Sequence, residues 1–207
     1  MASTIKVERM GLVARVSFCR PEVHNAFNDT LIHEMTDVFK KLRDDAALRV
    51  VELTGEGKSI CAGADLNWMR KVKDYGYEKN YQESLALAEL FALIYETPVP
   101  VIGRVNGAAI GGGTGFVAVC DIALAAESAQ FSFSEVKIGV VPACIGPYVI
   151  RKIGSGKARE FFISGERMKA GRALSIGLVN PKAKEGRRCV PGGQRPASLR
   201  GRDFLGP

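Results

Sequence analysis

A carboxylate and two loops rich in small residues are the parts of this 207-residue sequence that could do chemistry. The first loop, GAAIGGGTGFVAVCD, spans residues 107–121 and contains three consecutive glycines at 111–113. Glycine weakens helices and strands, so three glycines together indicate that something approaches the backbone closely. A helix that begins here would leave its first N–H groups unpaired, and these groups could bind an anion or a developing oxyanion.

The second loop, CAGADLNWM, spans residues 61–69 and also follows a predicted strand. The side chains of Ala62, Gly63 and Ala64 are small enough for a ligand to lie on the backbone. If one N–H from each loop converges on a single point, the two would form an oxyanion hole, in which each donor is typically worth about 2.7–4 kcal/mol of transition-state stabilisation. Neither a Gly-x-Gly-x-x-Gly motif nor a P-loop ending is present, which favours an oxyanion over a nucleotide phosphate.

The carboxylate is that of Glu135, in the segment SFSEVKIGVVP. It stands between Ser134 and an apolar run, where partial desolvation would raise its pKa toward the range useful for proton transfer. Taken alone, a glutamate after a strand is more often a solvated surface residue. A glycine run, taken alone, is equally typical of close packing between a helix and a strand. Local sequence leaves both alternatives open.

The patterning around these segments predicts strands that alternate with helices. Runs rich in β-branched residues predict strands at 12–18, 49–54, 101–105 and 122–125. Periodic apolar positions predict a helix capped by Asn28 or Asp29, and helices at 78–96, 146–153, 156–164 and 169–177. The glycine run opens one more helix. This alternation indicates an α/β fold.

The composition, with 46% hydrophobic and 25% charged residues, is typical of a soluble globular protein. No apolar run approaches the length of a membrane span, and the first residues lack a signal-peptide pattern. Five cysteines without CxxC spacing predict reduced thiols in the cytoplasm. Because the chain has only two histidines, His24 and His33, we expect no metal site and assign both side chains a structural role.

The charge is concentrated at one end of the chain. Of the net charge of +7, +5 falls on residues 181–207. This segment is rich in glycine and proline and has too few apolar residues to pack a core. We therefore expect a core domain at 1–180 and a basic, disordered tail at 181–207, without nucleic acid as the main partner. Arg151 and Lys152 of the core are expected on a solvated helix face.

Four segments, in order, resemble the crotonase, or enoyl-CoA hydratase/isomerase, superfamily. They are RPEVHNAFN (20–28), ELTGEGKSICAGADLNWM (52–69), the segment 100–142 that contains both the glycine run and SEVKIGVVP, and GERMKAGRALSIGLV (165–179). The resemblance implies a spiral of repeated ββα units. It also implies an acyl-CoA thioester as substrate, no separate cofactor, and a homotrimer or hexamer.

The resemblance assigns roles by position. It implies that the N–H groups of Ala64 and Gly112 form the oxyanion hole and that Glu135 is the catalytic glutamate. The implied substrate-binding residues are Val23, Ala62, Gly63, Ala64, Asp65, Leu66, Asn67 and Gly112. What approaches the glycines would then be the carbonyl group of the thioester.

One position departs from the family pattern. Typical hydratases carry a second glutamate where this chain has Gly115. We therefore expect Glu135 to act alone in a hydro-lyase that adds water to a 2-enoyl-CoA, with a branched 3-methylglutaconyl-type group as the favoured acyl group. An enoyl-CoA isomerase or decarboxylase, or a non-catalytic relative that binds acyl-CoA or RNA, stays open as an alternative.

Family members continue past the Gly-Leu-Val at 177–179 with helices that complete the CoA site and the trimer contact. Residues 181–207 show no helical periodicity. The resemblance therefore predicts that the usual C-terminal helical region is truncated here, as a frameshift would do, and that the protein has low solubility.

Overall fold

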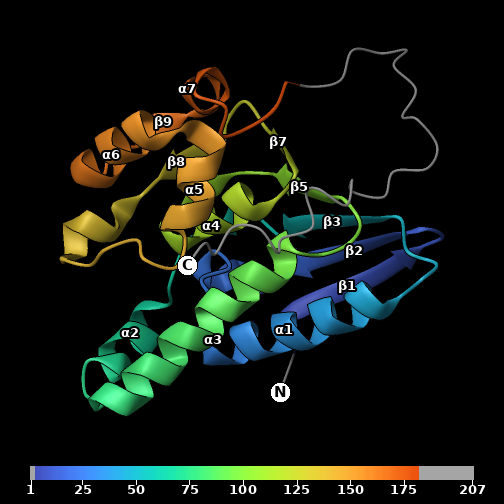
Figure 1. Ribbon diagram of the computed structural model, residues 1–207, viewed down its shortest axis with the longest axis horizontal. Helices are drawn as coiled ribbons and strands as arrows, with labels where there is room; N and C mark the ends of the chain where they lie inside the picture. Colours follow the sequence, from blue (N-terminus) through green and yellow to red (C-terminus); the bar gives the residue numbers. More distant parts are fainter. Residues whose placement is uncertain (1–2, 182–207) are drawn as a thin grey trace, which may run out of the picture.

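The strands form two sheets in the computed structural model, which describes residues 3–181 (Figure 1). The first sheet has the order β1 (Ile5–Met10), β2 (Val13–Phe18), β3 (Val50–Gly55), β5 (Val101–Val105) and β7 (Ile122–Ala125). The second has the order β4 (Ser59–Cys61), β6 (Ala108–Ile110), β8 (Gln130–Ser132) and β9 (Met168–Lys169). Neighbouring strands are parallel, except for the antiparallel pairs β1–β2 and β8–β9.

Three successive turns of the chain each give one strand to the first sheet and the next strand to the second. β3 is followed by β4, β5 by β6, and β7 by β8. A helical segment comes after each strand of the second sheet. Because β3, β5 and β7 lie side by side and parallel, the turns stack as a spiral. The α/β class and the repeated ββα units are therefore confirmed.

Seven α-helices cover these sheets within residues 3–181. They are α1 (Asp29–Asp44), α2 (Leu66–Val72), α3 (Tyr77–Tyr95), α4 (Gly112–Val119), α5 (Gly146–Ile153), α6 (Ser155–Ser164) and α7 (Ala170–Ser175), together with the 3-10 turns η1 (Pro21–Val23) and η2 (Ser134–Ile138). Figure 1 shows α1 and α3 side by side, while α5, α6 and α7 gather near the second sheet.

Helix α1 shows how the sequence specifies these elements. The side chain of Asn28 accepts a hydrogen bond of 3.0 Å from the N–H of Leu31, which satisfies a donor left free at the helix start. The predicted cap is therefore Asn28 and not Asp29. The buried side chains recur at helical spacing and face the core: Leu31, Ile32, Met35, Phe39 and Leu42.

Helix α4 lies at the centre of the molecule. Every residue from Gly113 to Val119 is buried. The ring of Phe116 lies 5.0 Å from that of Phe18, 5.9 Å from that of Phe27 and 4.8 Å from that of Phe91, between ring centroids. A helix held on all sides in this way presents its first residue, Gly112, from a fixed position.

The structure agrees with most of the expected elements and differs at residues 61–69. The predicted strands and helices correspond to β2, β3, β5, β7, α3, α4, α5, α6 and α7, but residues 61–69 are not a loop throughout. β4 ends at Cys61 and α2 begins at Leu66, because the side chain of Asp65 caps the N–H groups of Asn67 and Trp68. The predicted tail lies outside the described residues, apart from its first residue.

Within residues 3–181, no helix combines the length and apolar character needed to span a membrane.

Candidate active site

The two small-residue loops and Glu135 meet at one edge of the second sheet. β4, β6 and β8 are parallel neighbours, so their carboxyl ends lie at the same edge. Ala64 follows β4, Gly112 follows β6, and Glu135 follows β8. The order of the strands places the glycine run between the other two segments. Carboxyl ends of parallel strands are where open α/β sheets commonly bind ligands.

The N–H groups of Ala64 and Gly112 are available as donors. Residues 24–27 pair with 62–65 through hydrogen bonds that use the N–H groups of Ala62, Phe27 and Asp65 and pass over that of Ala64. Gly112 is the first residue of α4, where N–H groups have no partner inside the helix. Neither N–H donates to another residue in the described part of the chain.

Packing explains two of the three consecutive glycines. A Cβ atom at Gly112 would lie 2.7 Å from Cε1 of Phe27, and one at Gly113 would lie 2.1 Å from the carbonyl oxygen of Cys61. Both distances are too short for any side chain. A Cβ atom at Gly63 would in turn lie 3.9 Å from the nitrogen of Gly112. The glycines therefore let the two loops touch through their backbones, which places the free N–H groups near each other.

The third glycine lies beneath the carboxyl group. Gly111 has φ +54°, which favours glycine, and its N–H donates to the carbonyl oxygen of Ser132 at 2.7 Å. A Cβ atom at Gly111 would lie 3.4 Å from Oε1 of Glu135. The carboxyl group thus lies against the turn that starts α4.

The carboxyl group of Glu135 is partly buried and incompletely hydrogen-bonded. Its Oε2 atom is buried and has no hydrogen-bond partner among the described residues. Burial raises the pKa of Glu135 above its usual value, because desolvation disfavours the charged form. A partly desolvated carboxyl group without a fixed partner can hold a proton or release it, as acid–base catalysis requires.

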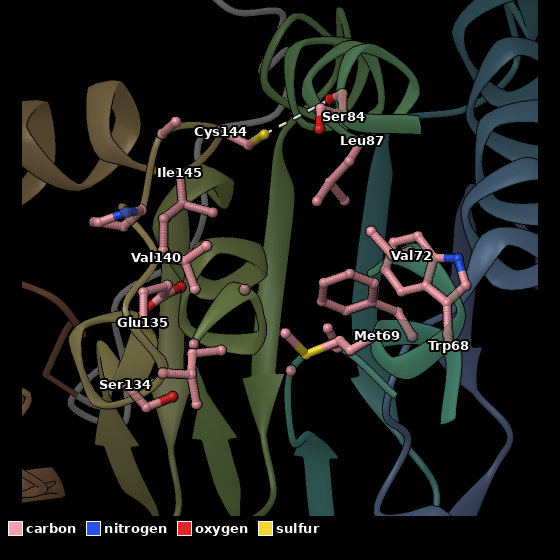
Figure 2. A pocket seen from close by; sticks show the side chains of 18 of the residues that line it. Trp68, Met69, Val72, Ser84, Leu87, Ser134, Glu135, Val140, Cys144 and Ile145 are labelled. Carbon is pink, nitrogen blue, oxygen red and sulfur yellow. Dashed lines mark hydrogen bonds between the residues drawn. The ribbon is translucent and has the colours of Figure 1, made fainter. Parts of the chain in front are cut away.

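These groups open into a cavity of about 430 Å³. Figure 2 shows Met69, Val72 and Leu87 on one side, and Glu135, Val140 and Ile145 on the other. The thiol of Cys144 donates a long hydrogen bond of 3.7 Å across the cavity to the carbonyl oxygen of Ser84. Most lining side chains are apolar, as expected of a site that holds an acyl chain.

The structure brings together most of the predicted site residues but not all. Ala62, Gly63, Ala64, Leu66, Gly112 and Glu135 line the cavity. Val23, Asp65 and Asn67 do not line it. The exposed Asn67 accepts a hydrogen bond from Arg70, and Val23 ends the turn η1.

Asp65 supports the site from behind. Its carboxylate accepts a hydrogen bond of 2.9 Å from the guanidinium of Arg20, and both side chains are largely buried. Burial alone would raise the pKa of Asp65, but the hydrogen bonds from Arg20 and from the N–H groups of Asn67 and Trp68 lower it below its usual value. The predicted ligand-binding aspartate is therefore an ionised cap that fixes the loop containing Ala64.

The expectation that Lys152 lies on a solvated helix face is wrong. The ammonium group of Lys152 donates to the carbonyl oxygens of Val117 and Cys120, at the end of α4. Desolvation lowers its pKa. A cation at this position complements the negative end of the helix, whose other end presents Gly112. His33 is exposed, and His24 lies 3.1 Å from Ser59 Oγ through its Nδ1.

The space beside Gly115 is also filled by neighbouring side chains. A Cβ atom there would lie 2.2 Å from Cγ2 of Ile145, so no glutamate could occupy this position without displacing that side chain. The cavity lining also includes four residues that were not predicted from the sequence: Val72, Leu87, Val140 and Ile145. Each is an ordinary apolar residue, and only the packing of distant segments brings it to the cavity. Residues 3–181 contain no group of three acidic, histidine or cysteine side chains that could hold a metal ion.

Comparisons with known proteins agree with this geometry. The family model described as enoyl-CoA hydratase/isomerase matches residues 8–184. A Thermus thermophilus protein, named as a candidate enoyl-CoA hydratase, is 36% identical over 183 residues, which cover 88% of this chain and 72% of that protein.

Solved structures give the same result. A candidate enoyl-CoA hydratase/isomerase (crotonase) from Legionella pneumophila is 42% identical, with a TM-score of 0.84, over 86% of this chain and 69% of the other. An enoyl-CoA hydratase from Shewanella pealeana is 38% identical, with a TM-score of 0.83, over 85% and 66% of the two chains. The chain therefore belongs to the enoyl-CoA hydratase/isomerase, or crotonase, family.

Proposed function

We propose that this protein adds water to the C2=C3 double bond of a 2-enoyl-CoA, with Glu135 as the acid–base residue. The observation that carries the proposal is the buried carboxyl group of Glu135, which has no partner for Oε2 and lies in the same cavity as two free N–H groups. The role of those N–H groups, at Ala64 and Gly112, is to donate hydrogen bonds to the thioester oxygen, which lies between them.

The reaction proceeds through an enolate. The Glu135 carboxylate accepts a proton from water while the water oxygen bonds to C3. The π electrons of the double bond then move toward the thioester carbonyl, and the oxyanion that forms accepts hydrogen bonds from Ala64 and Gly112. The Glu135 carboxyl group next donates the proton to C2, which yields a 3-hydroxyacyl-CoA and restores the carboxylate. Its raised pKa suits the group to both transfers.

One carboxyl group performs both transfers in this mechanism. The other acid in the cavity lining, Glu83, accepts a hydrogen bond of 3.1 Å from the indole Nε1 of Trp68. Ile145 occupies the space beside Gly115. The described residues therefore offer Glu135 alone for proton transfer beside the two donors.

The lining also bears on the acyl group. Its charged side chains among the described residues, Glu83 and Glu135, are both acidic. A 3-methylglutaconyl group carries a terminal carboxylate, which would be placed in an apolar cavity without a cation. We therefore propose an uncharged acyl group as the preferred substrate, in place of the 3-methylglutaconyl group that the sequence favoured.

Isomerisation of a 3-enoyl-CoA is the second candidate. The single unpaired carboxyl group supports it, because moving a proton from C2 to C4 needs one base that returns the same proton. Most side chains around Glu135 are apolar, and no second carboxyl group of the described residues lies beside it to position a water molecule. The enolate and its two donors would be the same in both reactions.

The test is to follow absorbance of the conjugated enoyl thioester with the purified protein. Loss of absorbance from crotonyl-CoA reports hydration, whereas a gain from a 3-enoyl-CoA reports isomerisation. We expect hydration of crotonyl-CoA to exceed that of 3-methylglutaconyl-CoA. Glu135→Gln should abolish activity, and Glu89→Gln, on the exposed side of α3, should preserve it. Acyl-CoA binding without turnover of any of these substrates would contradict the proposal and favour a non-catalytic relative.

Assembly and location belong to the same proposal. We propose the homotrimer or hexamer implied by the family resemblance, and a cytoplasmic location based on the cysteine pattern. Size-exclusion chromatography with light scattering of the active fraction would measure the first. A monodisperse trimer would also contradict the low solubility expected from the sequence.

A further inference from the structure

Ile145 separates the cavity from the protein core. Its side chain lines the cavity and is 2% exposed. Behind it lie Gly115 and Phe91, which are buried and do not line the cavity. A Cβ atom at Gly115 would lie 2.2 Å from Cγ2 of Ile145 and 3.1 Å from Cζ of Phe91. These three residues thus meet, with Ile145 on the cavity side.

The exposure of the lining residues shows which end of the cavity is closed. Leu66 is 68% exposed, Val141 78% and Val140 48%, so these side chains lie toward the mouth. Phe27 and Ile145 are the buried apolar side chains of the lining, and Ile145 is the one that lies against Gly115 and Phe91. Ile145 immediately precedes α5, and Val149, one turn along this helix, is fully buried.

We infer that Ile145 determines acyl-chain length, by closing the inner end of the cavity over Gly115 and Phe91. This inference rests on the proposed function, because it assumes that the cavity holds the acyl group. An acyl chain that extends past Glu135 meets the branched side chain of Ile145. It can go no further, because α4 and α3 are closely packed behind that side chain.

Replacing Ile145 by alanine would remove three carbon atoms and open the space over Gly115. That space would accept about two more methylene groups of the acyl chain. Each buried methylene group is worth about 0.8 kcal/mol, so the affinity for the longer chain should rise about 15-fold relative to the shorter chain. Ile145→Val removes one carbon and keeps the Cγ2 contact with Gly115, so it should shift the preference by about one methylene group, or roughly fourfold.

The experiment measures binding of saturated acyl-CoA thioesters, from butyryl to dodecanoyl, by isothermal titration calorimetry. Saturated chains cannot be hydrated, so binding is read without turnover. Ile153→Ala is the matched control, because it makes the same change at the other end of α5, at a buried residue that does not line the cavity. We expect the optimum to move to longer chains in Ile145→Ala and, by a smaller step, in Ile145→Val, but not in Ile153→Ala.

An unchanged optimum in Ile145→Ala would overturn the inference, and so would an equal shift in Ile153→Ala. If Ile145→Ala does not fold, Ile145→Val decides, since it is the milder change. Binding that depends on Ile145 in a protein that never hydrates crotonyl-CoA would support the inference and contradict the proposed hydration. The two proposals can therefore fail separately.

Discussion

Arg20 and Asp65 form an ion pair of 2.9 Å directly behind the loop that presents the N–H of Ala64. The same aspartate caps α2 through the N–H groups of Asn67 and Trp68. Arg20 also donates to the carbonyl oxygen of Ala26, so it joins the segment before α1 to the loop after β4. The position of one proposed donor thus depends on a carboxylate that does not line the cavity.

We expect Asp65→Asn to keep the helix cap but to leave Arg20 without its ionic partner. Because the pair is largely buried, the free energy of unfolding should fall by about 1–3 kcal/mol, and kcat should fall as the loop loosens. Thermal denaturation and hydration assays measure both effects. Asp45→Asn is the control, because the Asp45–Arg9 pair is more exposed and should contribute about 0–1 kcal/mol.

The lowered pKa of Asp65 also predicts how the stability difference between the wild type and Asp65→Asn changes with pH. Since the pKa of Asp65 is lowered in the folded protein, its contribution is present above the unfolded pKa and is lost as pH falls through the folded pKa. The stabilities of the wild type and Asp65→Asn should therefore differ at neutral pH and converge in acid. A constant difference across this range would contradict the assignment.

Glu135→Gln should be inactive but more stable than the wild type at neutral pH. Because burial raises the pKa of Glu135, the folded protein binds this proton more tightly than the unfolded chain. The ionised carboxylate therefore costs stability, and this cost grows as pH rises through the window between the unfolded and folded pKa values. Activity should fall by about 10²–10⁴-fold. A lower melting temperature for Glu135→Gln at pH 7 would argue against the desolvated carboxylate.

The acid limb of the rate profile should report the same group. Hydration needs the Glu135 carboxylate as base, so kcat/KM should fall as pH drops through the raised pKa of this residue. The midpoint is expected above the value of an ordinary glutamate, about 4.3. A pH titration of kcat/KM for crotonyl-CoA would show it, and a midpoint at or below that value would contradict the role.

Gly113→Ala should strongly destabilise the protein. The new Cβ atom would lie 2.1 Å from the carbonyl oxygen of Cys61, and a buried backbone atom cannot move aside cheaply. We expect a loss of about 1–3 kcal/mol or more in the free energy of unfolding. Gly156→Ala, in α6, has open space around it and should be neutral or stabilising. Equal melting temperatures for the two variants would show that the loops do not touch.

Thiol labelling should distinguish the cysteines by position. Burial raises the pKa of the Cys61 thiol to about 12, so this thiol should not react in the native protein. Cys144 and Cys19 are half-buried and should react slowly. Because Cys144 lines the cavity and Cys19 does not, acyl-CoA should protect Cys144 alone. Mass spectrometry after maleimide treatment would locate the labels, and equal protection of both thiols would contradict the proposed acyl site.

The sequence predicted the long elements well because each has its own period. The α1 stripe, the β3 run and the 146–153 helix need no distant partner to be recognised. The strands β4, β6 and β8 have three residues each, too few for alternation to appear. Yet these short strands are what align the turns that contain Ala64, Gly112 and Glu135.

Some residues of the candidate site could likewise be predicted from the sequence, and others could not. The two loops and the glutamate could be found from local residue types and from the family resemblance. The apolar walls could not, because nothing in the residues around Leu87 or Ile145 shows that α3 and the start of α5 face one cavity. The position of Lys152 was equally hidden, since its carbonyl partners lie more than thirty residues away.

The backbone contact between Gly113 and Cys61 belongs to the part of the site that is proposed to stabilise charge, whereas other parts shape the cavity. Many binding sites assign both tasks to the same residues. The groups proposed to stabilise the negative charge of the substrate belong to the main chain, and neighbouring backbone and a buried ring hold them in place. The groups that shape the acyl cavity are side chains on other elements. Substitutions over evolutionary time can therefore exchange one acyl preference for another while the charge-stabilising centre is inherited unchanged.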